Sequence, residues 1–263
     1  MGEKVKKNVK WYNNRFVPWM LPIGVIILWQ VLGQYKIITS TILPTPLEVV
    51  QASIRLWKSG DLQKHVLIST ERALVGFAIG GIIGFVLGLL NGTMLFFEKT
   101  VDTTVQMIRT IPHLALIPLV ILWFGIGESA KVFLVTLGVL FPIYINTFNG
   151  IKNVDRKLIE MGSIYGLSKW KLFSNIILPG ALPSILVGIR YALGVMWTSL
   201  IVAETIGADS GIGFMATSAR EFMQMDIVVL TIVLYAILGK LSDFIAKLFE
   251  HRLLKWNPAF QKK

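Results

Sequence analysis

The chain has 263 residues, of which 54% are hydrophobic and only 16% are charged, and its mean hydropathy is +0.66. Soluble domains carry about 25% charged residues, so this composition excludes an ordinary soluble domain and indicates a protein that crosses a membrane several times. The formal charge of +11 lies mainly at the ends of apolar segments, which fits membrane topology better than nucleic-acid binding, and the lack of cysteine excludes disulfides and thiolate metal sites.

The first apolar run covers residues 16–32 and follows a lysine-rich segment. Gln34, Tyr35 and Lys36 come directly after it, without the small residues that mark a cleavage site. We therefore expect an uncleaved first membrane helix rather than a signal peptide.

A long segment, residues 33–69, follows and is expected on the extracytoplasmic side. Its Leu43-Pro44-Thr45-Pro46 stretch predicts an extended turn, because proline restricts the residue before it. Residues 47–58 then predict an amphipathic helix that ends at Ser59-Gly60. We expect this helix to lie along the outer membrane face or beside the bundle.

The second span, residues 73–90, has glycine at every fourth position: Gly76, Gly80, Gly84 and Gly88. This spacing puts small residues on one face, where another helix can approach closely. We interpret the stripe as a helix-packing face. A surface that slides during transport is the alternative that the sequence leaves open.

Four more spans are expected, over residues 111–124, 132–148, 183–206 and 227–249, which makes about six in an all-α fold. Pro112, Pro118 and Pro142 each remove a backbone donor, so they are expected to bend or break their helices. Of the 26 Lys and Arg residues, 17 lie in segments expected inside and 7, including Arg72 just before the second span, in segments expected outside. This bias predicts that both termini are cytoplasmic.

The loop of residues 152–179 is polar and basic and predicts two short helices. Asp155 can cap the first, Gly166 can end it in the left-handed conformation, and Ser168 can cap the second. Pro179 is expected to close the loop before the next span. An amphipathic hairpin of this kind fits insertion into a groove on a soluble partner, and packing against its own bundle is the alternative.

The spacing in this loop resembles the EAA loop of ABC-importer permeases, which reads Glu-Ala-Ala, three residues, Gly, nine residues and Ile-x-Leu-Pro. The chain keeps five of these positions: Glu160, Gly166, Ile176, Leu178 and Pro179. It departs at Met161 and Gly162, where the family usually has alanine, and Gly162 is expected to loosen the first loop helix.

Nearly the whole chain resembles the nitrate/sulfonate/taurine branch of these permeases, and most closely its aliphatic sulfonate permeases. The segments that carry the resemblance are residues 112–119, 123–127, 141–146, 203–206, 210–213, 219–222 and 256–259. The resemblance implies a single permease domain over residues 1–263 with the type I importer fold, similar to MetI, in the bacterial inner membrane. It implies transport by alternating access and no catalysis by this chain.

The same resemblance implies partners and functional residues. The partners are a second copy of the permease, two cytosolic ATPase subunits that hold ATP and Mg, and an extracytoplasmic substrate-binding protein; this chain is expected to carry no cofactor or metal. The ATPase-coupling residues by position are Glu160, Met161, Gly162, Ile164, Tyr165, Gly166, Leu167 and Pro179. Candidate pathway or gate residues are Pro112, His113, Trp123, Met196 and Glu204.

Ionisable residues within spans mark functional positions in membrane proteins. Glu204, near the outer end of its span, is expected in an outer gate or in contact with the binding protein. Arg190 lies 14 residues away, about 21 Å along a helix, so the two cannot pair directly. Arg190 is expected to snorkel, and Lys240 can pair with Asp243.

Other classes of function remain as alternatives. Taurine, nitrate or another small solute could replace sulfonate as the substrate. A self-contained secondary transporter would need internal repeats and coupling residues at the midplane, and neither is evident in the sequence. The chain has no Gly-x4-Gly-Lys-Ser/Thr phosphate loop and no HExxH or Gly-x-Ser-x-Gly motif, so an ATPase or a membrane hydrolase is not supported.

Overall fold

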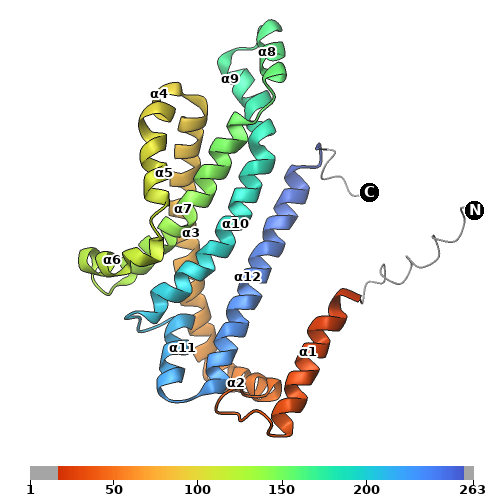
Figure 1. Cartoon of the computed structure of the whole chain (residues 1–263), viewed down its shortest axis with the longest axis vertical. Helices are drawn as coiled ribbons and strands as arrows, with labels where there is room; N and C mark the ends of the chain where they lie inside the picture. The colour runs from red at the N-terminus through yellow and green to blue at the C-terminus, as the bar shows by residue number, and fades with distance from the viewer. Residues whose placement is uncertain (1–16, 258–263) are drawn as a thin grey trace, which may run out of the picture.

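A computed structural model of the chain describes residues 17–257, and the regular structure in this part is entirely helical (Figure 1). The elements are, in chain order, α1 (Val17–Gln34), α2 (Pro46–Ser59), α3 (Asp61–Thr93), α4 (Leu95–Phe97), η1 (Glu98–Asp102), α5 (Thr103–Arg109), η2 (His113–Leu116), α6 (Ile117–Phe124), α7 (Glu128–Lys152), α8 (Arg156–Ile164), α9 (Lys169–Leu172), η3 (Phe173–Ile177), α10 (Leu178–Thr205), α11 (Ile212–Glu221) and α12 (Met225–Leu253). Three of the expectations fall partly outside the described residues. They concern the lysine-rich start, the first residue of the first span and the end of the 256–259 motif.

Four helical segments are long and apolar enough to cross a bilayer: α3, α7, the run Lys169–Thr205 that ends in α10, and α12. A fifth candidate is the pair Leu95–Arg109 and His113–Phe124, whose halves are bent by 81°. The described part of α1 adds a shorter apolar helix, Trp19–Gln34. By length and composition the described chain therefore has four or five candidate spans, fewer than the expected six.

The second span is longer than the sequence indicated. α3 begins at Asp61, so the last part of the expected outer segment 33–69 belongs to the same helix as the second span. Arg72, which the charge pattern placed outside, lies within α3 and is 3% exposed. The first turns of α3 contain polar and charged residues, so the apolar pattern of the sequence placed the start of the span later, at residue 73.

The predicted amphipathic helix is confirmed as α2. Thr45 accepts a hydrogen bond from the Glu48 N–H, and the Glu48 carboxylate accepts one from the Thr45 N–H, which forms a capping box. Pro46 occupies the first turn, where a missing N–H costs nothing. Gly60 ends the helix with φ of 86°, a conformation that favours glycine.

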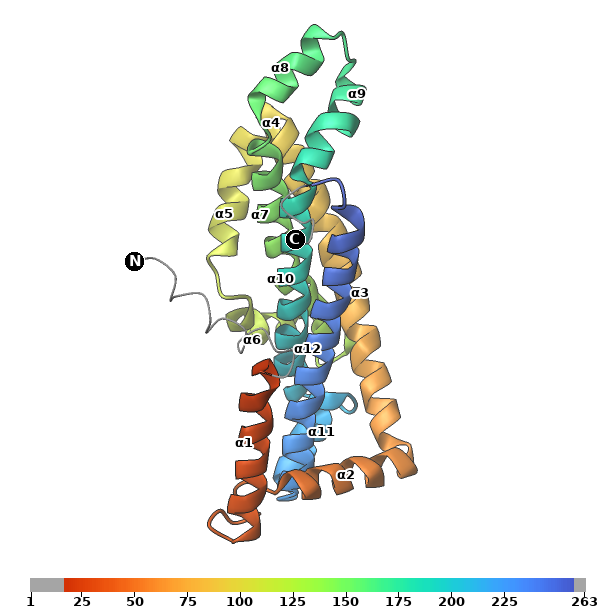
Figure 2. The same cartoon turned by 90° about the vertical axis from the view of Figure 1, so that its right-hand side faces the viewer.

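The glycine stripe of α3 lies directly against α7, which packs between α3 and α10 (Figures 1 and 2). Gly76, Gly80, Gly84 and Gly88 are all buried. A Cβ atom at any of the four would overlap α7; at Gly80 and Gly84 it would meet backbone carbonyl oxygens of that helix. The two backbones can approach this closely only because these positions lack side chains.

A pair of neighbouring substitutions tests this packing. Gly80→Ala is expected to lower stability by about 1–3 kcal/mol, because the new methyl group meets the Thr136 backbone oxygen, which cannot move without shifting α7. Gly81→Ala is the matched control, since its methyl group meets only the tip of Ile143 at 3.4 Å and alanine favours helix. Thermal unfolding in detergent measures both; equal midpoints would contradict close packing through the stripe.

The helices α4, η1 and α5 before the expected third span were not predicted. Their charged residues interrupt the apolar pattern, but the structure pairs them with α7. Glu98 accepts from Lys152 at 2.6 Å, and Asp102 accepts from the Tyr144 hydroxyl at 2.5 Å. Asn91 of α3 donates to the same hydroxyl at 2.7 Å, so three elements meet around Tyr144.

The prolines behave differently from one another. Pro112 lies at the break between α5 and η2, and Pro118 lies in the first turn of α6, as expected for helix breakers. Pro142 lies inside α7, which continues from Glu128 to Lys152, so of the two expected effects, a bend or a break, the break does not occur there. The Pro142 carbonyl accepts a hydrogen bond from the Asn146 amide at 2.8 Å, which stabilises the helix beside the proline.

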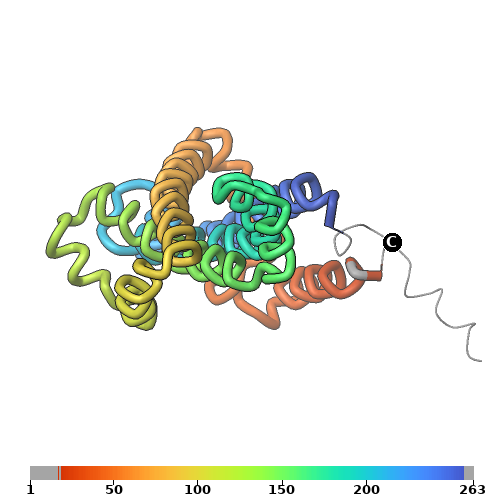
Figure 3. Tube along the Cα trace, turned by 90° about the horizontal axis from the view of Figure 1, so that it is seen from above, coloured from red at the N-terminus to blue at the C-terminus, as the bar shows by residue number. Residues whose placement is uncertain are grey.

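The bundle has two distinct ends. The α8–α9 hairpin projects from one end, and α2 and α11 lie at the other (Figures 1 and 2). The start of α1 and the end of α12 both point toward the hairpin end. Seen along the bundle, α1 lies at the side, away from α3 and α7 (Figure 3), and most of its side chains are exposed. Such an apolar, exposed helix fits a lipid environment or a further interface.

Candidate functional site

The hairpin of residues 152–179 is shaped by three local signals. Asp155 caps α8 by accepting a hydrogen bond from the Lys157 N–H at 2.9 Å. Gly166 follows α8 with φ of 73°, its N–H donates to Ser163 and the Leu167 N–H donates to Gly162, which together form a Schellman motif. Ser168 caps α9, so the predicted helix-glycine-helix arrangement is confirmed.

Gly162, which was expected to loosen the first loop helix, has a different structural role. It is buried, and a Cβ atom there would lie 2.6 Å from Ile176 and 2.9 Å from Leu172. These two side chains belong to the second arm of the hairpin. Gly162 therefore lets the two arms pack closely together, and α8 is not broken at this residue.

The outward face of the hairpin is apolar and exposed. Leu158, Met161, Ile164, Tyr165 and Trp170 are between 46% and 84% exposed. Its inward face packs on the bundle through Ile159, Ile176 and Ile177, which contact a core that includes Ile151 and Ala181. Glu160 is exposed on α8. One face of the hairpin therefore packs against the bundle, and the other face is exposed within the described chain.

The base of the hairpin is continuous with α10. The π-helical turn η3 joins α9 to α10, and Pro179 lies in the first turn of α10 rather than at a break. The expected closure of the loop at Pro179 is wrong, because the helical run from Lys169 to Thr205 continues through this proline, directly after the π-helical turn η3. A displacement of the hairpin therefore acts directly on a helix that crosses the bundle.

The candidate pathway residues do not share one surface. The His113 Nε2 atom lies 2.9 Å from the Ser199 hydroxyl and connects η2 to α10, directly after Pro112. Trp123 is 61% exposed at the end of α6. Met196 is 1% exposed and belongs to the main hydrophobic core. The structure brings His113 to α10, in which Met196 is buried, and leaves Trp123 on the surface.

Glu204 lies in a buried polar cluster at the end of the bundle opposite the hairpin. Its side chain is 0% exposed and accepts hydrogen bonds from Ser69, Arg72, the Gly213 N–H and Tyr235. These partners come from α3, α11 and α12, so one carboxylate connects α10 to three other helices. Its enclosure leaves no surface for contact with a docking protein.

Arg72 is the ionic partner of Glu204, and the sequence alone did not identify it. Its Nη1 atom lies 2.8 Å from Glu204 and 2.7 Å from the Ser210 carbonyl oxygen. Its Nε and Nη2 atoms each lie 2.5 Å from Glu128, and Nη2 also contacts the Ser210 hydroxyl. All five N–H donors of the guanidinium are therefore used. The only sequence signal was an arginine directly before the glycine-rich span of residues 73–90.

The remaining span charges are paired near the hairpin end. Arg190 does not snorkel freely: it donates to Asp243 at 2.6 Å and lies 3.9 Å from Glu250. Lys240 lies 3.7 Å from Asp243, as expected, and Lys247 lies closer to it, at 3.0 Å. Arg190 and Glu204 do not interact, as their spacing predicted. These pairs connect α10 to α12.

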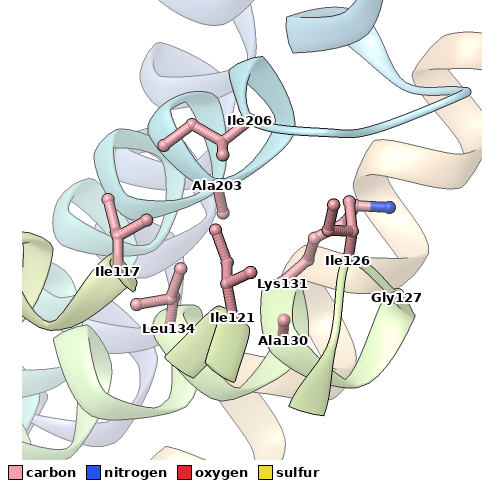
Figure 4. Close-up of a pocket in the computed structure, with 9 residues that line it drawn as sticks. All are labelled: Ile117, Ile121, Ile126, Gly127, Ala130, Lys131, Leu134, Ala203 and Ile206. Atoms are coloured by element: carbon pink, nitrogen blue, oxygen red, sulfur yellow. The ribbon is translucent and has the colours of Figure 1, made fainter. Parts of the chain in front are cut away.

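A small apolar pocket lies beside the Arg72–Glu204 cluster, between α6, α7 and the end of α10 (Figure 4). The residues that line it are Ile117, Ile121, Ile126, Gly127, Ala130, Lys131, Leu134, Ala203 and Ile206. Lys131 lines the pocket with its carbon stem, and its nitrogen points away from the apolar side chains (Figure 4). Within residues 17–257 no group of three or more His, Asp and Glu side chains could hold a metal ion.

Sequence comparison relates the chain to known transport proteins. Residues 80–255 match the family described as binding-protein-dependent transport system inner membrane component. The permease protein SsuC of Escherichia coli, named for aliphatic sulfonate transport, is 57% identical over 255 residues, which cover 97% of each chain. SsuC of Bacillus subtilis is 44% identical over 92% of this chain and 88% of its own. The taurine transport system permease TauC of Escherichia coli is 31% identical over 90% and 88%, respectively.

Solved structures support the fold. An amino acid ABC transporter matches 76% of this chain and 97% of its own, with a TM-score of 0.63 and 17% identity. The inward-facing MetNI methionine ABC transporter matches 67% of this chain and 92% of its own, with a TM-score of 0.51 and 23% identity. The helical arrangement is thus that of ABC-importer permeases of the MetI type.

Proposed function

Because the chain belongs to the family of binding-protein-dependent inner membrane transport components, we propose that it imports aliphatic sulfonates with energy from a separate ATPase. It is a multi-pass permease subunit of an ABC importer, and the system requires an ATPase and a binding protein. The sulfonate assignment rests on one observation, the 57% identity to SsuC of Escherichia coli over 97% of both chains.

The proposed topology has six spans with both termini in the cytoplasm. The spans are α1, α3, the bent pair that ends in α6, α7, the run that ends in α10, and α12. The shared direction of the start of α1 and the end of α12 supports this arrangement (Figure 1), as does the excess of Lys and Arg in the inner segments. In this topology one permease domain carries a cytoplasmic hairpin at 152–179 and an outer segment at 33–69.

The hairpin is proposed as the contact with the ATPase. Its exposed apolar face, Leu158, Met161, Ile164, Tyr165 and Trp170, is of the kind that inserts into a groove on a partner. Gly162, Gly166 and Leu167 shape the hairpin, Glu160 lies on its exposed surface, and Pro179 connects it to α10. Two copies of the permease would engage two ATPase subunits, which hold ATP and Mg.

Alternating access then follows from the connection between the hairpin and α10. Closure of the ATPases on ATP would move the hairpin, and the helix that begins at its base would carry the motion to Glu204 at the far end. Glu204 is proposed as part of the outer gate through the helices it connects. His113 and Pro112, at the bend before α6, are proposed along the pathway, with Trp123 and Met196 as further candidates.

Reconstitution tests this function. Proteoliposomes that contain the chain, its ATPase and its binding protein are expected to take up radiolabelled hexanesulfonate only when ATP is present on the ATPase side. Competition by unlabelled hexanesulfonate, taurine and nitrate ranks the substrates. Stronger competition by taurine or nitrate would reassign the substrate within the branch. Uptake driven by an ion gradient, with the chain alone, would instead support a secondary transporter.

A further inference from the structure

Two carboxylates bind Arg72, and they are held very differently. The Glu204 side chain is fully enclosed and has Ser69, Tyr235 and a backbone N–H as additional partners. The Glu128 side chain is 59% exposed, and its hydrogen bonds in the described chain go only to Arg72 and Lys131. Glu204 is therefore a fixed counter-ion, whereas Glu128 can leave toward solvent.

Both cations beneath Glu128 are buried. The side chains of Arg72 and Lys131 are 3% and 5% exposed, and Lys131 Nζ lies 3.1 Å from Glu128 Oε1. If Glu128 swings away, the two cations retain only the charge of Glu204. A buried cation without a counter-ion is costly, so this position favours occupation by another anion.

The apolar pocket adjoins the same cations. Lys131 belongs to both. Its stem lies among Ile121, Ile126 and Ala130, and its nitrogen points away from them (Figure 4). That nitrogen donates to Glu128 at 3.1 Å. The free space in the pocket is about 10 Å³, which is room for one water-sized group. The pocket itself is therefore too small for an alkyl chain, whereas the side on which Glu128 is exposed is open to one.

We propose that Arg72 and Lys131 bind the head group of an alkanesulfonate at the end of the bundle opposite the hairpin, and that the Glu128 carboxylate occupies this position in the present structure. The proposal rests on the proposed function for the choice of sulfonate. The sulfonate oxygens would accept the hydrogen bonds that Arg72 Nε, Arg72 Nη2 and Lys131 Nζ now donate to Glu128. Glu128 would turn into solvent, and the alkyl chain would leave the site through the exposed side that the Glu128 side chain now occupies.

Equilibrium binding of radiolabelled hexanesulfonate to the assembled importer in nanodiscs, without binding protein, tests the site. Glu128→Gln removes the competing carboxylate and is expected to raise the affinity about tenfold or more. Lys131→Met is expected to lower it by a similar factor, and Lys131→Arg to restore it.

Matched controls use exposed residues of the same charge near the same end. Glu71→Gln and Lys64→Met are expected to leave binding unchanged, because both side chains lie on the surface of α3. Unchanged affinity in both Glu128→Gln and Lys131→Met would overturn the site. A second assay adds the binding protein. If Glu128→Gln raises only the affinity for the binding protein and not for hexanesulfonate, the site is also wrong, because its occupant would then be an acidic side chain of that protein.

The site and the proposed function can fail separately. If the importer transports hexanesulfonate and the site variants bind it like the unaltered protein, the site is wrong and the function stands. If the importer transports taurine or nitrate instead, the sulfonate assignment is wrong. In that case the proposed site stands only if Glu128→Gln raises, and Lys131→Met lowers, the affinity for the transported anion.

Discussion

Replacing Gly166 by proline is expected to leave the permease in the membrane and to abolish ATP-driven uptake. Gly166 has φ of 73°, whereas proline is fixed near −65° and has no N–H to donate to Ser163. The Schellman turn would open, and the exposed apolar face of α8 would no longer be held at a fixed angle to α9. ATP hydrolysis stimulated by loaded binding protein, and uptake into proteoliposomes, measure the loss.

Gly60 provides a matched control for this substitution. It also ends a helix in the left-handed conformation, with φ of 86°, and its N–H donates to Trp57. A Cβ atom would meet nothing at either glycine, so the backbone penalty is similar at the two sites. Gly60→Pro lies at the opposite end of the bundle and is expected to retain stimulated hydrolysis. Equal losses in both variants would show a general folding defect rather than failure of the hairpin.

A charge reversal separates contact from shape. Glu160→Lys keeps the backbone of α8 intact and changes only an exposed side chain, so it is expected to reduce stimulated hydrolysis without lowering stability. Glu221→Lys, an equivalent reversal on exposed α11, is the control. Normal coupled uptake by Glu160→Lys together with Gly166→Pro would contradict docking through the hairpin.

The sequence was most informative where local geometry determines structure. Capping by Asp155 and Ser168, the helix end at Ser59-Gly60 and the left-handed position of Gly166 depend on neighbouring residues, so they could be predicted from the sequence. The glycine stripe predicted a close helix contact, although its partner, α7, could not be named. Pairing across long distances in the chain leaves no local pattern.

The buried cluster shows this limit clearly. Glu204 stood out because a carboxylate near a membrane span needs a partner, and the spacing correctly excluded Arg190. Arg72 lies 132 residues away in sequence, and no periodicity connects the two. Arg72 was also assigned to an outer segment, because a charged residue at the start of an apolar run is usually taken as its boundary. Only the packing of α3 against α10 and α11 brings these groups together.

Breaking this cluster is expected to destabilise the bundle more than breaking any surface pair. Glu204→Gln leaves Arg72 buried with a reduced counter-charge, and Arg72→Met leaves Glu204 buried without its cation; each is expected to cost about 3–5 kcal/mol. Asp243→Asn is the comparison, because Asp243 is 28% exposed and its pair with Arg190 is accessible to water. Its loss is expected to cost about 0–1 kcal/mol. Thermal unfolding of the purified permease in detergent gives the ranking.

The double substitution Arg72→Met with Glu204→Gln provides the decisive comparison. Removing both charges leaves no uncompensated ion, so the double variant is expected to be more stable than the sum of the two single losses predicts. Glu128 would then keep Lys131 as its remaining partner, and the N-terminal turn of α7 would lose only its arginine contact. Additive losses in this cycle would mean that Arg72 and Glu204 stabilise the protein independently. In that case their ion pair would not be the connection that holds α3 to α10 at this end of the bundle.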